Sequence, residues 1–465
     1  MKNRLFGSRE FYRRVLAISV PIMVQNAITN FVSLLDNVMI GRVGTVEMSG
    51  VAIANQLIFV FNMLVFGAVA GAGIFGAQFF GNNDMDGVRH TLRFKLMICT
   101  VLAGACIGVF ITFGPQLINL YLKGEGSVED AEASLRFGLE YIKVMYIGML
   151  PYAITQAYAG TLRETGETLL PMKAGIVAVL VNLSFNYILI FGHFGAPRLG
   201  VVGAAIATVL SRFVELVIVV TWAHRHAVRF PYISGLYRSL HIPKRLFGDI
   251  LRRGTPLLLN EGLWAAGMAM LNQCYSLRSL DVVAATNISS TIWNLFACVY
   301  LAMGSAISIM VGQELGAGDF EKAKVTARQT TAFSVAISVG VGLLMAFVGT
   351  YFPLIYRTTD AVRHLATSLI GIGACLMPFT AMTNALYFTL RAGGKTIVTF
   401  LFDSAFVWLI NIPVAYVLSR YTDMPILLLY ACCQSLEIIK CAIGTVMVKK
   451  GIWINNIVAD KKGEV

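Results

Sequence analysis

Long runs without a single charged residue set the strongest limit on how this chain can fold. Such runs recur along its length, and three of them are 48–83, 96–122 and 282–313. About 20 apolar residues are enough to cross the hydrocarbon core of a bilayer as a helix. Only 13% of the 465 residues are charged and the mean hydropathy is +0.71, whereas soluble domains carry about twice that share of charge. The chain is therefore expected to be a membrane protein that crosses the bilayer many times.

Hydrophobicity within these runs is continuous rather than alternating, which favours helices over the strands of a membrane barrel. We therefore predict an all-α polytopic membrane protein with twelve transmembrane helices. The predicted spans are 14–40, 47–79, 91–114, 137–160, 167–192, 199–223, 248–275, 281–312, 325–350, 362–388, 396–419 and 424–448.

The positions of Lys and Arg predict the orientation of these spans. With the N-terminus inside, most of the 37 basic residues fall in cytoplasmic segments, as the positive-inside rule requires. Both termini are then cytoplasmic, and Arg212 is the one basic residue that we assign to neither the cytoplasmic nor the external side. Basic loops that face an anionic lipid leaflet also explain the net charge of +12. We expect the lipid bilayer as a partner and no nucleic acid.

Other classes of chemistry find no support in the sequence. The eight cysteines lie within spans and form no CxxC, and the histidines flank spans without a second ligand pair, so we expect no metal site. The stretch "GAGIFG" (71–76) matches GxGxxG, but it lies in an uncharged run with no preceding strand. We interpret it as small residues for close helix packing. Neither a cofactor nor enzymatic activity is expected.

Two short sequence motifs each occur twice in the chain. "QFFGNND" (78–84) and "QELGAGD" (313–319) share Gln, Gly and Asp at an offset of 235 residues, which also separates Pro21 from Pro256. "TLRETGET" (161–168) and "TLRAGGKT" (389–396) are related at an offset of 228. The difference between the offsets falls in a predicted external loop, where length changes are tolerated. These repeats indicate two related halves.

Six spans in each half is an even number, so the halves cross the membrane in the same direction. This predicts two parallel six-helix repeats, a design in which transporters carry substrate between the halves. The segment that links the halves, residues 224–247, is expected to lie on the membrane surface, with its basic side chains beside Phe230, Tyr232 and Tyr237. The predicted domains are an N-terminal lobe (1–223), a cytoplasmic basic linker (224–247), a C-terminal lobe (248–448) and a cytoplasmic tail (449–465).

The ordered set of motifs resembles the multidrug and toxic compound extrusion (MATE) transporters. The set comprises "LLDNVMIGRVG" (34–44) at the end of the first span, the LRxxGxT pair, and QxxGxxD after spans two and eight. The resemblance covers essentially the whole chain. It implies a V-shaped transporter of two lobes that exports cationic amphipathic compounds in exchange for Na⁺ or H⁺.

Charged residues inside a bilayer are costly and are functional candidates by default. Arg212 and Glu215 are spaced i,i+3 on span six and are expected to neutralise each other. Glu437 and Lys440 repeat that spacing near the cytoplasmic end of span twelve, where we expect Lys440 to reach the interface. The acids without a basic neighbour on their own helix are Asp36, Glu261 and Asp403.

Asp36 is predicted to belong to a site for the coupling ion or proton. Counting the rise per residue places it about 8 Å below the external surface, with Asn182, Asn186 and Thr208 at similar depth. Oxygen ligands of this kind suit a hard cation or a shared proton. The resemblance implies the same grouping, since one family branch joins an Asp of span one to polar residues of spans five and six. This chain has Asn186 where an acid often stands.

Glu261 and Asp403 are predicted to contact the cationic substrate, with Trp264 and Trp408 as aromatic faces for the cation. Glu261 resembles the span-seven acid of the family's other branch. That branch also uses an acid on span ten, where this chain has Thr380.

The function that we predict is a multidrug efflux antiporter of the bacterial plasma membrane, active as a monomer on small organic cations. One alternative is a lipid-linked oligosaccharide flippase of the same superfamily, whose pyrophosphate substrates call for unpaired Arg or Lys. The other is a channel or receptor without coupled transport, which the duplicated halves with central acids argue against. The sequence leaves the choice between Na⁺ and H⁺ open.

Overall fold

The computed structural model describes residues 6–122, 128–356 and 358–459 and is helical along almost all of this length. Lipid offers backbone groups no hydrogen-bond partner, so each crossing segment satisfies its own as a helix. Ten helices come first in the chain: α1 (Arg9–Gly41), α2 (Thr45–Gly81), α3 (Met85–Leu122), α4 (Val128–Glu164), α5 (Leu169–Phe191), α6 (Gly200–Arg225), α7 (Lys244–Ser276), α8 (Leu280–Gly316), α9 (Phe320–Tyr351) and α10 (Asp360–Ala392). Short 3₁₀ turns η1 (His193–Gly195) and η2 (Phe352–Ile355) follow α5 and α9.

The eleventh predicted span is not one regular α-helix. It begins as α11 (Thr396–Phe400), passes through two π-helical segments, η3 (Leu401–Ala405) and η4 (Val407–Asn411), and ends as α12 (Ile412–Tyr421). The last span is α13 (Ile426–Lys449). π-Helical turns are rare and occur frequently at functional sites. Asp403, one of the predicted site residues, lies in η3.

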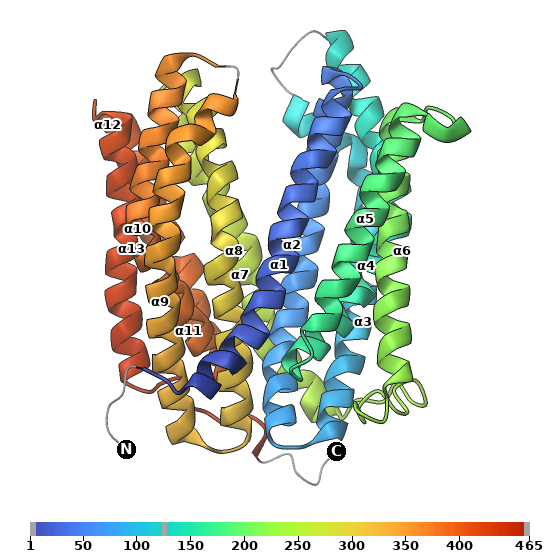
Figure 1. Ribbon diagram of the computed structural model, residues 1–465, viewed down its shortest axis with the longest axis vertical. Coiled ribbons are helices and arrows are strands. Elements are labelled where there is room, and N and C mark those ends of the chain that lie inside the picture. The colour runs from blue at the N-terminus through green and yellow to red at the C-terminus, as the bar shows by residue number, and fades with distance from the viewer. Residues whose placement is uncertain (1–5, 123–127, 357, 460–465) are drawn as a thin grey trace. The chain divides into compact units, whose positions relative to one another are not determined.

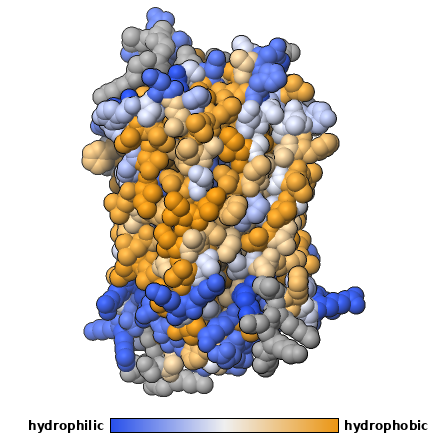
Figure 2. All heavy atoms as spheres, turned by 90° about the vertical axis from the view of Figure 1, so that its left-hand side faces the viewer, coloured by the Kyte–Doolittle hydropathy of each residue, from blue (hydrophilic) through white to orange (hydrophobic). Residues whose placement is uncertain are grey.

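Among the described residues, ten helical segments are long and apolar enough to cross a membrane by composition alone. The two remaining predicted spans correspond to α4 and α7, which carry acidic or basic residues in their first turns. On the face that Figure 2 displays, hydrophobic residues form a band and hydrophilic residues gather at both ends of it. The expectation of an all-helical polytopic membrane protein is confirmed.

The chain forms two compact units, and the division between them does not fall at a single point in the sequence. Unit 1 holds residues 1–23, 77–84 and 250–464, and unit 2 holds most of 24–249. The helices α1 and α2 each begin in one unit and end in the other. Within unit 2, α4 packs on α3 and α6, and α6 packs on α5 (Figure 1). Within unit 1, α10 packs on α8, α9 and α13 (Figure 1).

The linker is bound to α3 through its backbone. Residues 226–243 form turns, and Phe230 and Tyr232 are 5% and 1% exposed. Arg89 of α3 donates hydrogen bonds to the carbonyl oxygens of Pro231 and Tyr232, at 3.0 and 3.2 Å. Arg93 binds the carbonyl oxygens of Gly235 and Leu236, both at 2.9 Å. Phe230 and Tyr232 are therefore buried in protein, whereas Tyr237 is 59% exposed, and the position of the linker at the membrane surface stays a prediction.

Candidate functional site

Unit 2 brings the four residues of the predicted coupling site into one hydrogen-bonded chain. Asn186 Nδ2 donates to Asp36 Oδ1 at 2.6 Å and to Asn182 Oδ1 at 3.1 Å. Asn182 Nδ2 donates in turn to Thr208 Oγ1 at 3.2 Å. The two asparagines lie one turn apart on α5, which places both amides on the same face toward α1 and α6. Asn186 and Asn182 are 1% and 5% exposed, whereas Asp36 and Thr208 are partly exposed.

One oxygen of this chain has no donor. Asn186 Oδ1 is buried and has no hydrogen-bond partner among the described residues. A buried polar atom left in this way costs free energy unless an ion, a proton donor or water meets it. Together with the carboxylate of Asp36, it forms a small set of hard oxygen ligands suited to a monovalent cation or a proton.

Tyr141 is a member of this site that sequence reasoning missed. It is 5% exposed on α4, and its hydroxyl interacts with the side chains of Thr208 and Asn55. A tyrosine in a transmembrane helix is usually read as interfacial or as packing, so nothing in the sequence separates Tyr141 from the other aromatic residues. The contact with Thr208 appears only once α4 and α6 are packed together.

Unit 1 holds a second polar cluster, around Asn260 and Glu261 of α7. Tyr387 of α10 donates its hydroxyl to Glu261 Oε1 at 3.3 Å and accepts a hydrogen bond from Asn260 Nδ2 at 3.2 Å. Asn260 also donates to Asp403 Oδ2 at 3.0 Å and accepts from the hydroxyl of Ser404 at 2.7 Å. Asn260 thus binds Asp403 directly and is linked to Glu261 through the hydroxyl of Tyr387.

Asp403 has a cationic partner that the sequence did not reveal. Lys440 Nζ of α13 binds Asp403 Oδ1 at 2.7 Å, and the side chains are 6% and 16% exposed. The expectation that Lys440 reaches the membrane interface beside Glu437 is therefore wrong. The ammonium is also close to the rings of Phe402 and Phe406. Charge pairing between helices explains the difference, because a buried ammonium is stable only beside an opposite charge.

The predicted tryptophans take separate places. The N–H of Trp408 donates to the carbonyl oxygen of Leu263 at 2.9 Å, which holds the indole along α7. Trp264 is 38% exposed. Their assignment to the substrate stays a prediction.

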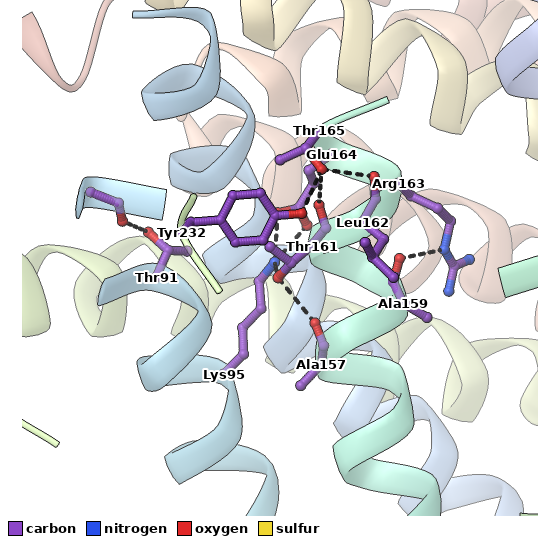
Figure 3. Close-up of polar contacts among 11 residues, drawn as sticks. Thr91, Lys95, Ala157, Ala159, Thr161, Leu162, Arg163, Glu164, Thr165 and Tyr232 are labelled. Carbon is purple, nitrogen blue, oxygen red and sulfur yellow. Dashed lines mark hydrogen bonds and ion pairs between the residues drawn. The ribbon is translucent and has the colours of Figure 1, made fainter. Parts of the chain in front are cut away.

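A second buried charge pair, between Lys95 and Glu164, lies in unit 2. Figure 3 shows Lys95 of α3 pointing at Glu164, the last residue of α4, with Thr161 and Tyr232 beside them. The Lys95 ammonium lies 2.7 and 2.6 Å from the two carboxylate oxygens and 3.1 Å from the Thr161 hydroxyl. Lys95 is fully buried.

The glycines of the "GAGIFG" stretch explain how this pair fits. A side chain at Gly73 or Gly76 of α2 would overlap the carboxylate of Glu164. The stretch lies within α2, so its interpretation as helix packing is confirmed. Tyr232 of the linker donates to or accepts from Thr165 at 2.9 Å, and burial raises the pKa of this tyrosine. Each of the buried lysines Lys95 and Lys440 is thus neutralised by an acid of its own unit.

The guanidinium of Arg212 lies over the ring of Tyr152 at 4.3 Å. Glu215, one turn further along α6, interacts electrostatically with Arg212 and with Arg163. Arg163, from the LRxxGxT motif, is therefore a second cation that acts on this glutamate.

Comparison with known proteins relates the sequence to one family. The MatE family model matches residues 21–188 and 258–417, one segment in each half. The "Probable multidrug resistance protein NorM" of Thermotoga maritima is 25% identical over 418 residues, which cover 90% of this chain and 88% of that protein.

Solved structures share the fold. A mutant of the Vibrio cholerae MATE transporter VcmN superposes with a TM-score of 0.86 at 17% identity, over 96% of this chain and 98% of that chain. A transporter of the MOP superfamily from Pyrococcus furiosus gives a TM-score of 0.82 at 18% identity, over 96% and 97%. It is described as having a binding pocket of reverse polarity, which suggests a different function for that protein.

Proposed function

The chain belongs to the MATE family of multidrug efflux transporters, and we propose that it exports cationic amphipathic compounds in exchange for Na⁺ or H⁺. The observation that supports this most directly is the hydrogen-bonded chain Asp36–Asn186–Asn182–Thr208 with its buried, unpartnered amide oxygen. A cation or proton bound there would neutralise a carboxylate that lies among apolar helices. We propose that the protein resides in a bacterial plasma membrane, with both termini in the cytoplasm, and acts as a monomer.

Coupling requires that the ion and the drug each favour a different state of the transporter. A ligand shifts a conformational equilibrium only by its differential affinity for the two states. Binding at Asp36 changes the charge that α1, α5 and α6 enclose, so it changes which packing of these helices is most stable. The drug would select the other state through contacts in unit 1.

For the drug, Glu261 is the acid that we propose as the main contact. Asp403 already accepts hydrogen bonds on both oxygens, from Lys440 and Asn260. Glu261 accepts one at 3.3 Å from Tyr387, which leaves its carboxylate the more available of the two. In this proposal Trp264 and Trp408 add aromatic surface, and Asp403 contributes chiefly by holding Asn260.

The charges around these sites favour organic cations over the pyrophosphates of a lipid-linked sugar flippase. Such a flippase needs unpaired basic groups, whereas Lys95 and Lys440 are each bound by a carboxylate. A channel without coupling would have no use for an ion or proton site at Asp36.

Everted membrane vesicles test the proposal. The vesicles are prepared from cells that express the protein. Uptake of a fluorescent organic cation is followed while a Na⁺ gradient or a pH gradient is imposed separately. We expect uptake with one gradient and none without either. Uptake that runs at the same rate with no gradient would support the channel, and transport of a polyprenyl pyrophosphate but of no cation would support the flippase.

A further inference from the structure

The repeated QxxGxxD motifs meet each other in unit 1. A side chain at Gly81, the last residue of α2, would overlap the carbonyl oxygen of Gln313. A side chain at Gly316, the last residue of α8, would overlap the carbonyl oxygen of Gln78. Each motif thus supplies the glycine that lets the other helix approach. Since any residue with a Cβ would separate the backbones, glycine is required at both places.

The two glutamines of these motifs bind opposite ends of the chain. Gln313 Oε1 accepts a hydrogen bond from Arg14, near the start of α1, at 2.9 Å. Gln78 is fully buried and binds the C-terminal segment. Its Nε2 donates to the carbonyl oxygens of Ala392 and Asn455 at 3.0 and 3.2 Å, and its Oε1 accepts from the backbone N–H of Ile457 at 2.8 Å.

The segment that binds Gln78, residues 453–458, is called the strap below. It touches α8 as well as α2, because Asn456 Nδ2 donates to the carbonyl oxygen of Gly316 at 3.1 Å. The strap is therefore hydrogen-bonded to both members of the glycine crossing. Residues 449–465 are expected from the sequence to be a cytoplasmic tail. Within them, the strap is packed against other parts of the protein.

Apolar side chains anchor the strap. Trp453 is 1% exposed and Val458 is fully buried, although neither lies in a regular helix. The backbone of Trp453 lies close to Gly393, and a side chain at position 393 would overlap the carbonyl oxygen of Trp453. Gly393 and Gly394 belong to the second LRxxGxT motif, so this motif forms the surface on which the strap rests. Sustained burial of a tryptophan and a valine is not the behaviour of a solvated tail.

We propose that the strap holds the ends of α2 and α8 together and must release them for this end of the transporter to open. Alternating access requires each end of a transporter to open in turn. The end of α2 belongs to unit 1 while its first 32 residues belong to unit 2, so relative motion of the units pulls on the glycine crossing. The strap resists that motion through Gln78 and Gly316. It therefore sets how often the crossing opens.

Alkylation of a cysteine at position 77 measures this opening. Ala77 is 3% exposed, and its Cβ lies 3.0 Å from where a side chain at Gly312 would begin. In a background without the eight native cysteines, Ala77→Cys should react slowly with a maleimide in detergent-solubilised protein. A stop codon after Ile452 removes the strap and should raise the rate at least about fivefold, since each lost hydrogen bond shifts an equilibrium by a factor of a few.

Two further variants keep the test decisive. Full-length Gln78→Met retains the length of the side chain without its hydrogen bonds, and should raise the rate at position 77 about two- to threefold. A stop after Ala459 leaves the strap in place and should not change the rate. Lys322→Cys, at an exposed position, should react equally in all backgrounds. Solubilised protein makes the result independent of membrane orientation and of the coupling ion, so it is separate from the proposed function.

Parental rates at position 77 in both the shortened protein and Gln78→Met would overturn the proposal. If the shortened protein is not produced, Gln78→Met and Asn456→Ala decide, and unchanged rates in both overturn it. The reaction rate of Ile307→Cys, at a fully buried position of α8, detects a general loosening of the helix packing. An equal rise at positions 307 and 77 would also count against the strap.

Discussion

At the scale of single residues, Asp36 makes the most specific demand on the chemistry of this protein. Its carboxylate accepts a hydrogen bond from Asn186 at 2.6 Å, within a chain that continues to Thr208. Asp36→Asn keeps the shape of the side chain and removes the charge that a cation or proton would neutralise. We expect export driven by an ion gradient to fall to less than about a tenth of the parental rate, because the coupling step loses its charge.

Drug efflux from everted vesicles checks this expectation, with protein amounts matched by immunoblot. Asp423→Asn makes the same change at an exposed position after α12 and should transport at the parental rate. Drug binding to Asp36→Asn is expected to survive. Near-parental pumping against a gradient by this variant would remove Asp36 from the coupling site.

Lys440 and Asp403 allow a second test at this scale, directed at the buried ion pair. Loss of one partner leaves the other charge buried and unpaired, which typically destabilises by about 3–5 kcal/mol. Lys440→Gln and Asp403→Asn should each lower the melting temperature clearly, whereas the double variant should recover most of the loss. Thermal unfolding of the purified protein in detergent measures all four states of this cycle. Additive losses in the double variant would show that the two groups do not stabilise each other.

Glu261→Gln supplies the contrast to that cycle. Glu261 accepts a hydrogen bond from Tyr387 and interacts electrostatically with Arg391 and Asp403, without a close carboxylate–ammonium contact like that of Asp403 with Lys440 among the described residues. Its neutral variant should therefore unfold near the parental temperature while it transports a monovalent cationic dye more slowly. Dye transport at the parental rate would take Glu261 off the substrate path.

At the scale of helices, the glycine crossing of α2 and α8 is the contact most sensitive to substitution. Gly81→Ala places a methyl group where the carbonyl of Gln313 lies, and overpacking of this kind costs about 1–3 kcal/mol. We expect a lower melting temperature and slower transport. Gly108→Ala on α3 is the matched control, because a Cβ there would meet nothing within 4 Å. Equal melting temperatures for the two variants would contradict the close crossing.

Repeated motifs made this much of the helical architecture predictable. After each QxxGxxD glycine the chain turns through a positive φ, at Asn83 (57°) and at Gly318 (78°), which occupy equivalent places in the repeat. Asp319 then caps α9 by accepting from the N–H of Lys322 at 3.1 Å. Likewise, Gly166 and Gly394 of the LRxxGxT motifs have φ values of 89° and 72°. The duplicated residues encode how helices end and begin, which is local and therefore readable.

Contacts between helices distant in the sequence were not readable in the same way. Asn182 and Asn186 could be grouped with Asp36 because helical rise gives depth and the i,i+4 spacing gives a shared face. The pairing of Lys440 with Asp403 depends on the rotation of α13 against the π-helical segment η3, and no periodicity specifies that rotation. The strap was missed for a related reason, since six residues without helical or strand periodicity look like a tail.

At the scale of the whole molecule, the distribution of charge predicts how the chain sits in its membrane. Lys and Arg are retained on the cytoplasmic side during insertion, so the termini and the linker should be cytoplasmic. Asp86 and Lys322 follow α2 and α8 and are exposed, and Thr359 precedes α10 and is also exposed. Position 126, which we also expect to be external, lies outside the described residues.

Single cysteines test the orientation. In intact cells, a membrane-impermeant maleimide should label a protein with Thr359→Cys and leave Asp86→Cys and Lys322→Cys unmodified. In everted vesicles the pattern should reverse, because the opposite face is then exposed to the reagent. Labelling at 86 and 322 on the same face, opposite to 359, follows from an even number of spans per half. Asp86→Cys labelled in intact cells would mean that the basic residues face outward, and the direction of drug transport would then have to be assigned anew.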